Sequence, residues 1–287
     1  MSKLKILITG SSGQLGQCLR EISSRFTAFD FYFYSRPEFV LDDEQTMINV
    51  MASVKPDFCI NCAAYTAVDK AETEKEAAYN INAAGVAALA LLCRQHQTRF
   101  IHISTDYVFD GNVSSAYKEN DPVDPVNVYG ASKAEGEKLV AQNNPASVII
   151  RTSWVYSLYG KNFVKTMISL MNQKDDINVV ADQEGSPTCA IDLAQAILDI
   201  IVHKQWMPGI YHYSNKGTIS WYDFAVAIQQ KINSHCKVNP IPAASYPTPA
   251  KRPAFSVLDT SKIETAYGIT IPYWKDSLDK CLHKLQV

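Results

Sequence analysis

Short apolar runs alternate with segments of helical periodicity through the first 155 residues. The apolar runs are rich in β-branched and aromatic residues and read KILITG (5–10), FDFYFYS (29–35), FCINCAA (58–64), RFIHIST (99–105) and SVIIRTSW (147–154). Helical patterns follow them at residues 14–25, 44–53, 74–97, 129–142 and 161–172. Continuous apolar strands separated by helices are typical of a parallel sheet covered on both faces. We therefore expect an α/β fold with a doubly wound, Rossmann-type sheet.

Beyond about residue 155 the alternation loosens. INVVAD (177–182) and GIYHYS (209–214) predict further strands, SWYDFAVAIQQKI (220–232) predicts an amphipathic helix opened by Ser220, and the proline-rich stretch 240–253 predicts an ordered surface loop. We expect a dinucleotide-binding Rossmann domain in residues 1–155 and a smaller, mainly substrate-binding C-terminal lobe in residues 156–287. Some of the later segments are expected to return to the first domain.

The composition is that of an ordinary globular protein. Hydrophobic residues make up 47% of the 287, which is enough for a large core, and 27 basic residues nearly balance 29 acidic ones. Since no basic tract is long enough to follow a phosphate backbone, we expect no nucleic-acid partner. The start of the chain lacks the pattern of a signal peptide, and no later stretch is expected to reach the length of a membrane span. These features predict a cytoplasmic protein without a membrane partner.

Seven cysteines are scattered along the chain, an odd number that favours reduced thiols over a disulfide framework. Cys59 and Cys62 have the spacing of redox and zinc sites, but a second such pair or a histidine pair is missing. We interpret both as buried apolar residues and expect no metal site.

A glycine-rich turn follows the first predicted strand. TGSSGQLG places Gly10, Gly13 and Gly16 at regular spacing, with Gln14 and Leu15 at the start of the following helix. Glycines there permit a tight turn and a close approach to a pyrophosphate, to which the helix N-terminus offers free N–H groups. A strand before the turn and a helix after it favour a dinucleotide site over a purely structural turn.

The end of the second strand bears on the choice of cofactor. Where an acidic residue would bind the ribose of NAD, the sequence has Ser35 and Arg36. An arginine suits a 2′-phosphate, so we expect NADPH, with NADH as the alternative. Asp42 or Asp43 could still contact the adenosine, and an ordinary surface role for Arg36 stays open.

Tyr129 and Lys133 form a Y-x-x-x-K pair in the predicted helix 129–142. Residues four apart share a helix face, and a cation beside a phenol lowers its pKa. The pair therefore predicts a proton donor, although two unrelated residues on an exposed helix would give the same spacing.

Together these segments resemble the extended short-chain dehydrogenase/reductase superfamily and, within it, the dTDP-4-dehydrorhamnose reductases. The resemblance covers nearly the whole chain, in the family's order. It rests on GSSGQLG, INCAAYTAVDKAE, ISTDYVFDG, PVNVYGASKAEGE, RTSWVYSLYGKNFV, ADQEGSPT, GIYHYSNKGTISWYDFA and KRPAFSVLDTSKI.

The resemblance implies a role for each motif. Tyr129 protonates the substrate carbonyl oxygen, Lys133 lowers its pKa and holds the cofactor, and Thr105 hydrogen-bonds the same oxygen; a turn cap is the alternative role for Thr105. The further implied cofactor contacts are Ala63, Ala64 and Tyr65. The implied substrate contacts are Val68, Asp106, Trp154 and Arg252, for which loop packing, a core tryptophan and a loop salt bridge are the structural alternatives.

The reaction implied is the reduction of the C4 ketone of dTDP-4-dehydro-L-rhamnose to dTDP-L-rhamnose with NAD(P)H. Two alternatives stay open: another sugar-nucleotide reductase, dehydratase or epimerase, and a non-catalytic regulatory subunit resembling that of methionine adenosyltransferase. Dehydratases carry an Asp-Glu pair after the threonine, whereas Thr105 is followed by Asp106 and Tyr107. The expected partner is a nucleotide sugar, and the sequence leaves a homodimer open.

Overall fold

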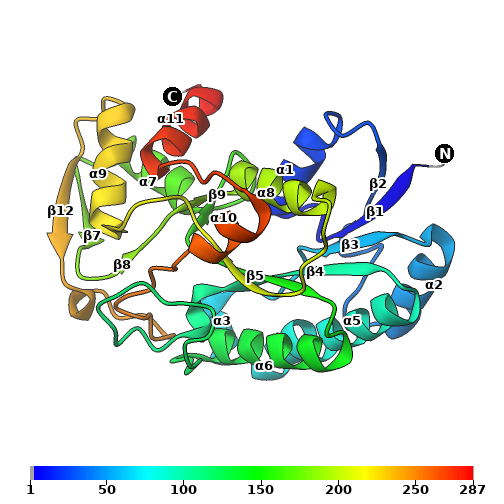
Figure 1. Cartoon of the computed structure of the whole chain (residues 1–287). Coiled ribbons are helices and arrows are strands. Elements are labelled where there is room, and N and C mark those ends of the chain that lie inside the picture. Colours follow the sequence, from blue (N-terminus) through cyan, green and yellow to red (C-terminus); the bar gives the residue numbers. More distant parts are fainter. Residues whose placement is uncertain (1–2, 287) are drawn as a thin grey trace.

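The computed structural model describes residues 3–286 and contains a central six-stranded sheet (Figure 1). Its pairings are all parallel, in the order β10-β5-β4-β3-β1-β2. The strands are β1 (Leu4–Thr9), β2 (Phe29–Phe33), β3 (Phe58–Asn61), β4 (Arg99–Thr105), β5 (Val148–Thr152) and β10 (Gly209–Tyr213). The predicted parallel sheet is confirmed, and each of the five N-terminal apolar runs supplies one strand.

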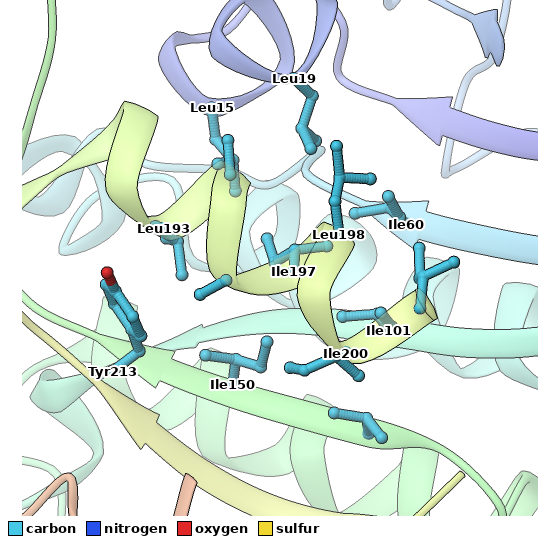
Figure 2. Close-up of a cluster of buried hydrophobic side chains, with 14 of the residues drawn as sticks. Leu15, Leu19, Ile60, Ile101, Ile150, Leu193, Ile197, Leu198, Ile200 and Tyr213 are labelled. Carbon is cyan, nitrogen blue, oxygen red and sulfur yellow. The ribbon is translucent and has the colours of Figure 1, made fainter. Parts of the chain in front are cut away.

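Helices cover both faces of this sheet, as a doubly wound fold requires (Figure 1). One face carries α1 (Gln14–Ser23), α8 (Ala190–Val202) and α10 (Ser261–Tyr267), and the other carries α2 (Glu44–Val54), α5 (Val86–Gln95) and α6 (Val128–Asn143). In Figure 2, Leu193 and Ile197 of α8 lie between α1 and the strands that bear Ile101 and Ile150. These side chains are fully buried and form the core beneath α8.

A smaller lobe lies beside the sheet and has its own core. It contains three two-stranded sheets, β6–β9, β7–β12 and β8–β11. Their bounds are β6 (Val155–Tyr156), β7 (Asp176–Val180), β8 (Glu184–Gly185), β9 (Thr188–Cys189), β11 (Ile219–Ser220) and β12 (Lys237–Ile241). The helices are α7 (Phe163–Met171), α9 (Trp221–Lys231) and α11 (Trp274–Leu285), and η3 (Ala243–Ser245) is a 3₁₀ turn. Phe224 and Trp274 are buried at the centre of this lobe.

The chain passes between the two cores repeatedly after residue 155. Helix α8 and strand β10 pack in the first core, α9 and β12 in the second, α10 in the first again, and α11 in the second. Ser220 caps α9 in a capping box with Asp223, as the sequence predicts for that helix. Neither lobe is therefore a single continuous stretch of sequence.

The predicted helix 74–97 is divided by a π turn. It consists of α4 (Lys75–Tyr79), the π-helical turn η1 (Asn80–Gly85) and α5. The segment Lys75–Gln95 is long and apolar enough to cross a membrane by length and composition, so the expectation that no stretch reaches that length is wrong. Much of this segment is buried in the protein core instead, where Val86, Leu89 and other apolar residues of α5 pack against the sheet.

An ion pair buried under α6 connects that helix to the sheet. Arg151 on β5 donates to both carboxylate oxygens of Glu137, at 2.7 Å from Nη2 to Oε2 and 3.0 Å from Nε to Oε1. Arg151 Nη1 also lies 3.4 Å from Nε2 of His212 on β10. Both members of the pair are almost inaccessible, so removal of either one would leave a buried charge without its opposite charge.

Removal of one member of this pair should destabilise the protein more than removal of both. Arg151→Met leaves the Glu137 carboxylate buried without its partner, and we expect a loss of about 3–5 kcal/mol in the free energy of unfolding. The double variant Arg151→Met/Glu137→Leu should recover most of this loss, since no unpaired charge is left. Urea denaturation of both variants measures the difference, and a single variant no less stable than the double one would contradict it.

Candidate functional site

A cleft of about 780 Å³ opens at the carboxyl ends of the central strands. Gly10 after β1, Cys62 after β3, Thr105 at the end of β4 and Thr152 at the end of β5 all line it. The strand order reverses between β1 and β3, and ligands of doubly wound sheets bind at such a reversal. Trp154 lines the side that faces the smaller lobe.

The glycine turn forms the floor of the cleft at the β1–β3 reversal. Gly10 has φ +64°, and a Cβ there would lie 2.6 Å from the backbone nitrogen of Ala63, so a side chain would strain the turn. Gly16 lies outside the cleft, where a Cβ would lie 2.5 Å from the carbonyl oxygen of Gly10 and separate α1 from the strand. Gly10, Gly13, Gln14 and Leu15 line the cleft as predicted.

The start of α1 fits a phosphate group. The N-cap residue is Gly13, which has no side chain to satisfy the first N–H groups, and the first turn carries no acidic residue. These unpaired N–H groups and the positive end of the helix dipole face the cleft and favour an anion. The turn therefore forms a cradle that suits the pyrophosphate of a dinucleotide.

The second strand ends beside this cradle. Arg36 and Asp42 both line the cleft, whereas the neighbouring Asp43 caps α2 by accepting from the Gln45 and Thr46 N–H groups. Glu38 accepts from the N–H and the hydroxyl of Ser35 and so closes its own turn. The carboxylate nearest to the end of β2 is thereby engaged within the loop, and Arg36 is the charged group of this turn that lines the cleft.

The loop after β3 lines the opposite wall and is held by the π turn. Ala63, Ala64, Tyr65 and Val68, the first residue of α3 (Val68–Ala71), all line the cleft. Asn82 in η1 accepts from the Tyr65 N–H at 2.9 Å and donates to the Tyr65 carbonyl at 3.0 Å. The Asn82 side chain thus binds both backbone polar groups of Tyr65, as a neighbouring β-strand would. The π turn therefore fixes the backbone position of the loop that faces the glycine turn.

Thr105 caps a turn, which is the alternative role considered for it, and it also lines the cleft. Its Oγ1 accepts from the Tyr107 N–H at 3.2 Å, which caps the 3₁₀ turn η2 (Asp106–Val108), and its hydroxyl donates to Asp106 Oδ1 at 3.0 Å. Asp106 lines the cleft but is almost inaccessible, and its Oδ2 has no hydrogen-bond partner in the described chain. Burial raises the pKa of Asp106 to about 6, and contacts with Ser256 and Thr105 offset part of that rise.

Tyr129 and Lys133 lie on the first turns of α6, in the helix that the sequence predicts. Asn127 caps this helix through a 2.7 Å bond from the Gly130 N–H. Both side chains line the cleft, and the Tyr129 ring meets the Tyr107 ring edge-on at 5.8 Å between centroids. A Cβ on Gly130 would collide with the Tyr107 carbonyl, so this glycine permits the close approach of α6 to η2.

The pKa of Tyr129 differs from the sequence expectation. Burial raises it to about 12, with a partial offset from the Thr105 hydroxyl, and lowering by Lys133 is not found. The physical reason is the direction of the lysine, whose Nζ donates to the Ile103 carbonyl at 2.7 Å and lies 3.2 Å from His102 Nε2. Burial also lowers the pKa of Lys133 to about 8. In the protein without ligands, Tyr129 is therefore a buried phenol with a raised pKa, and Lys133 is a buried ammonium with a lowered pKa.

Trp154 forms the aromatic wall of the cleft. It adopts φ +47° and stacks on Trp221, with 3.5 Å between ring centroids and 10° between planes. A Cβ on Gly185 would lie 2.6 Å from the Trp154 ring, so the indole is clamped between a glycine backbone and a second indole. Trp154 is only half-buried and lines the cleft, which excludes the alternative of a fully buried core tryptophan.

Arg252 lies beside the cleft rather than among the residues that line it. Its guanidinium makes a two-pronged ion pair with Asp69, with 2.8 Å between Nη2 and Asp69 Oδ2. This is the loop salt bridge considered from the sequence. The pair joins the C-terminal segment to α3, and Tyr107 lies close enough to interact with the Arg252 charge. Arg252 therefore borders the mouth of the cleft next to η2.

Several cleft residues are missing from the sequence predictions. They include Ser12, Phe39, Leu41, Tyr107, Gly160, Lys161, Leu193 and Trp221. Of the two cysteines with metal-site spacing, Cys59 is buried in β3 and Cys62 lines the cleft. Trp221 comes from the helix that Ser220 caps, and nothing local distinguishes it from a core tryptophan. Only the packing of the two lobes brings it to Trp154.

Comparison with known proteins identifies the family. The family model described as the RmlD substrate binding domain matches residues 4–287. The chain is 43% identical to dTDP-4-dehydrorhamnose reductase of Aggregatibacter actinomycetemcomitans, over 96% of this chain and 97% of the relative. It is 36% identical to the reductase of that name from Escherichia coli K12, over 98% of each chain.

Solved structures agree with these relatives over the full length. The crystal structure of a dTDP-4-dehydrorhamnose reductase from Clostridium acetobutylicum superposes with a TM-score of 0.95 at 39% identity, covering 99% of this chain and 100% of that one. The Bacillus anthracis enzyme, crystallised in complex with NADP, has a TM-score of 0.95 at 36% identity with the same coverage. A family model that spans nearly the whole chain, together with relatives well above 30% identity, shows that the chain belongs to the RmlD family.

Proposed function

We propose that this protein is an NADPH-dependent dTDP-4-dehydrorhamnose reductase, which reduces the C4 ketone of dTDP-4-dehydro-L-rhamnose to give dTDP-L-rhamnose. One observation carries the proposal: the glycine cradle and the Thr105, Tyr129 and Lys133 side chains line the same cleft. The names of relatives at 36–43% identity support the substrate, and the NADP in the Bacillus anthracis structure supports the cofactor.

NADPH bound in this cleft supplies the hydride. Tyr129 donates its phenolic proton to the oxygen that becomes the C4 hydroxyl. Thr105 donates a hydrogen bond to that oxygen when its hydroxyl proton turns from Asp106 Oδ1 to the substrate. A phenol of high pKa keeps its proton until negative charge develops on the substrate oxygen, as a general acid at neutral pH must. Lys133, one turn away on α6, orients the cofactor and supplies positive charge near the reacting groups.

The walls of the cleft suit a nucleotide-linked sugar. Asp106 lines the cleft, and its buried Oδ2 has no hydrogen-bond partner within the described chain, so a sugar hydroxyl that reached this oxygen would satisfy it. Trp154 and Trp221 both line the cleft, so this stacked pair offers apolar surface to the sugar and brings the smaller lobe into substrate binding. Arg252 borders the cleft mouth, and its guanidinium would bind diphosphate oxygens by exchanging them for the Asp69 carboxylate.

Arg36 and the loop after β3 complete the cofactor site. Arg36 would bind the 2′-phosphate, Asp42 the adenosine, and Ala63, Ala64 and Tyr65 the nicotinamide half of the cofactor. We propose a cytoplasmic location with neither nucleic-acid nor membrane partners. The near balance of 27 basic and 29 acidic residues and the partial burial of Lys75–Gln95 support it.

A dehydratase is less consistent with the site. A dTDP-glucose 4,6-dehydratase from Streptomyces venezuelae superposes with a TM-score of 0.82, but 15% identity makes this a likeness of fold alone. Here η2 presents Asp106 followed by the Tyr107 ring, which packs against Tyr129 instead of supplying a second carboxylate.

The assay that tests the function follows NADPH oxidation with and without dTDP-4-dehydrorhamnose and identifies the product sugar by NMR. Turnover without a 4-keto sugar, or none with it, would overturn the proposal.

Arg36→Ala should reduce the preference for NADPH. Loss of a charge-assisted bond to the 2′-phosphate costs about 1.5–3 kcal/mol, so we expect KM for NADPH to rise roughly 10- to 100-fold while KM for NADH stays almost unchanged. Steady-state kinetics with both cofactors measure this selectivity. Arg25→Ala, an exposed arginine that does not line the cleft, is the control. An equal effect on both cofactors would show that Arg36 does not contact the phosphate.

Tyr129→Phe and Lys133→Ala should differ in their effects. Tyr129→Phe keeps the ring contact with Tyr107 and removes only the proton, so turnover should fall by roughly 10² to 10⁴ with NADPH affinity retained. Lys133→Ala should weaken both turnover and NADPH binding. Stopped-flow turnover and fluorescence titration with NADPH separate the two signatures, with the exposed Tyr246→Phe as control. Near-normal turnover of Tyr129→Phe would refute its role as proton donor.

Asp106→Asn should stabilise the protein at alkaline pH. The folded pKa of about 6 lies above the ordinary value of 3.8, so the stability that this group contributes is present below pH 3.8 and is lost as pH rises through 6. The amide carries no charge and keeps an acceptor for Thr105. We expect a gain of up to roughly 3 kcal/mol at about pH 8 and little gain near pH 4. Urea denaturation across this range measures it, and a pH-independent difference would contradict the assignment.

A further inference from the structure

Four buried polar side chains form a line across the sheet behind the cleft. Thr9 on β1, Asn61 on β3, His102 on β4 and Lys133 on α6 are each no more than 1% exposed. Thr9 pairs with Asn61, and Asn61 with His102, as direct neighbours in the strand register. The contacts are 2.6 Å from Thr9 Oγ1 to Asn61 Oδ1, 3.1 Å from Asn61 Nδ2 to His102 Nδ1, and 3.2 Å from His102 Nε2 to Lys133 Nζ. Polar groups are costly in a sheet core, so the line calls for a specific role.

The backbone fixes the orientation of the Asn61 amide. The Ala63 N–H donates to Asn61 Oδ1 at 3.2 Å, and a backbone N–H can only donate. Asn61 therefore turns its oxygen to Ala63 and Thr9 and its NH₂ group to His102. Because an NH₂ group can only donate, His102 Nδ1 must carry a lone pair.

The proton of His102 is then assigned to Nε2. Burial and the neighbouring Lys133 charge hold the pKa of His102 well below its ordinary value, so the ring is neutral. A neutral imidazole without a proton on Nδ1 carries it on Nε2. His102 thus points an N–H at Lys133 Nζ. An ammonium has no lone pair with which to accept this bond, whereas a neutral amine has one.

We propose that His102 is a positioning residue that, through a tautomer fixed by Asn61, favours the neutral amine of Lys133 and makes its ammonium a readier proton donor. The inference rests on the proposed function, in which Lys133 works beside Tyr129. Tyr129 gives its proton to the substrate oxygen and becomes a phenolate. Lys133, which lines the same cleft, releases a proton to the cleft, from which the phenolate is reprotonated. The lysine thereby becomes the neutral amine that accepts from His102 Nε2–H, and solvent then restores the ammonium.

The other charged groups around α6 do not account for a preference of Lys133 for its neutral amine form. Glu137, one turn beyond Lys133, raises the pKa of the lysine but is neutralised by its bidentate pair with Arg151 of β5. Burial outweighs it and lowers the pKa of Lys133 to about 8. On the cleft side, Asp106 of η2 acts on Tyr129 and raises its pKa.

Two further charges meet the ends of α6. Glu72 accepts from the Val128 N–H at the start of the helix, and Arg94 of α5 donates to the Asn143 carbonyl at its far end. Neither has a hydrogen bond to Lys133, whose Nζ is engaged by Ile103 and His102.

The tautomer is measured directly by NMR of ¹⁵N-histidine-labelled protein without ligands. The chain has six histidines, and His102→Phe identifies the signal by its loss. If that variant does not fold, substitution of the other five assigns His102 by elimination. We expect a neutral ring with its proton on Nε2 from about pH 6 to pH 9. A proton on Nδ1, or an imidazolium in this range, would overturn the proposal.

Asn61→Asp tests the coupling to Lys133. The change replaces only the NH₂ group by an oxygen, so His102 Nδ1 must become the donor and Nε2 must become an acceptor for the Lys133 ammonium. The pKa of Lys133, followed by lysine NMR and by the alkaline limb of kcat, should rise by roughly one unit or more. In Asn61→Asp/His102→Phe the ring cannot transmit the change, so most of the rise should vanish.

The two outcomes separate this inference from the reaction itself. A rise that persists undiminished in the double variant would show a simple effect of the new charge and overturn the role of His102. The NMR measurements need no substrate, so protein that shows the expected tautomer and lysine shift but does not reduce the sugar nucleotide would refute the proposed function alone. Thr9→Val, which leaves the Asn61 NH₂ group in place, is the matched control and should leave the pKa of Lys133 almost unchanged.

Discussion

The site depends on how closely helix α6 approaches the backbone beneath it. A Cβ on Gly130 would collide with the Tyr107 carbonyl, and one on Gly136 would collide with the Asn82 carbonyl. Because neither position carries a side chain, the helix rests directly on η2 and on the π turn. This contact lowers Lys133 far enough to reach the Ile103 carbonyl on β4. The same contact places Tyr129 over the end of the strand that presents Thr105. The absence of a Cβ atom at these two glycines therefore sets the distance between the acid-base residues of α6 and the sheet.

Charged and titratable groups lie in unusually dry surroundings around this contact. Lys133, His102, Glu137, Arg151 and Asp106 are all almost inaccessible. Arg151 and Glu137 are paired with each other, so each compensates the burial of the other's charge. Asp106 is paired incompletely, because its Oδ2 has no hydrogen-bond partner among the described residues, and the burial of its charge therefore costs stability. Whether the protein supplies every hydrogen-bond partner therefore separates the compensated buried charges from the uncompensated one.

Local patterns in the sequence predict much of this arrangement and miss a definable part. The parallel strands, the glycine turn and the helix with Tyr129 and Lys133 depend on residues close together in the chain, so periodicity and spacing predict them. Trp221 beside Trp154 and Arg252 beside Asp69 depend on contacts across long stretches of sequence. The π turn that directs Asn82 toward Tyr65 has no characteristic amino-acid composition by which the sequence could predict it. The spacing of Tyr129 and Lys133 predicts a lowered phenol pKa, but burial, which spacing does not reveal, raises the pKa of Tyr129 instead.

The repeated passage of the chain between the two cores limits how the cleft can change shape. The segments near residues 155, 189, 214, 245 and 270 each cross from one core to the other. A rotation of the smaller lobe would have to bend all of them together, so a single hinge residue cannot govern it. Cutting the chain at one crossing would leave both cores incomplete, and neither lobe could be exchanged for a foreign one by a simple fusion. In a protein of this design, substrate specificity changes by substitution along the cleft walls rather than by exchange of a module.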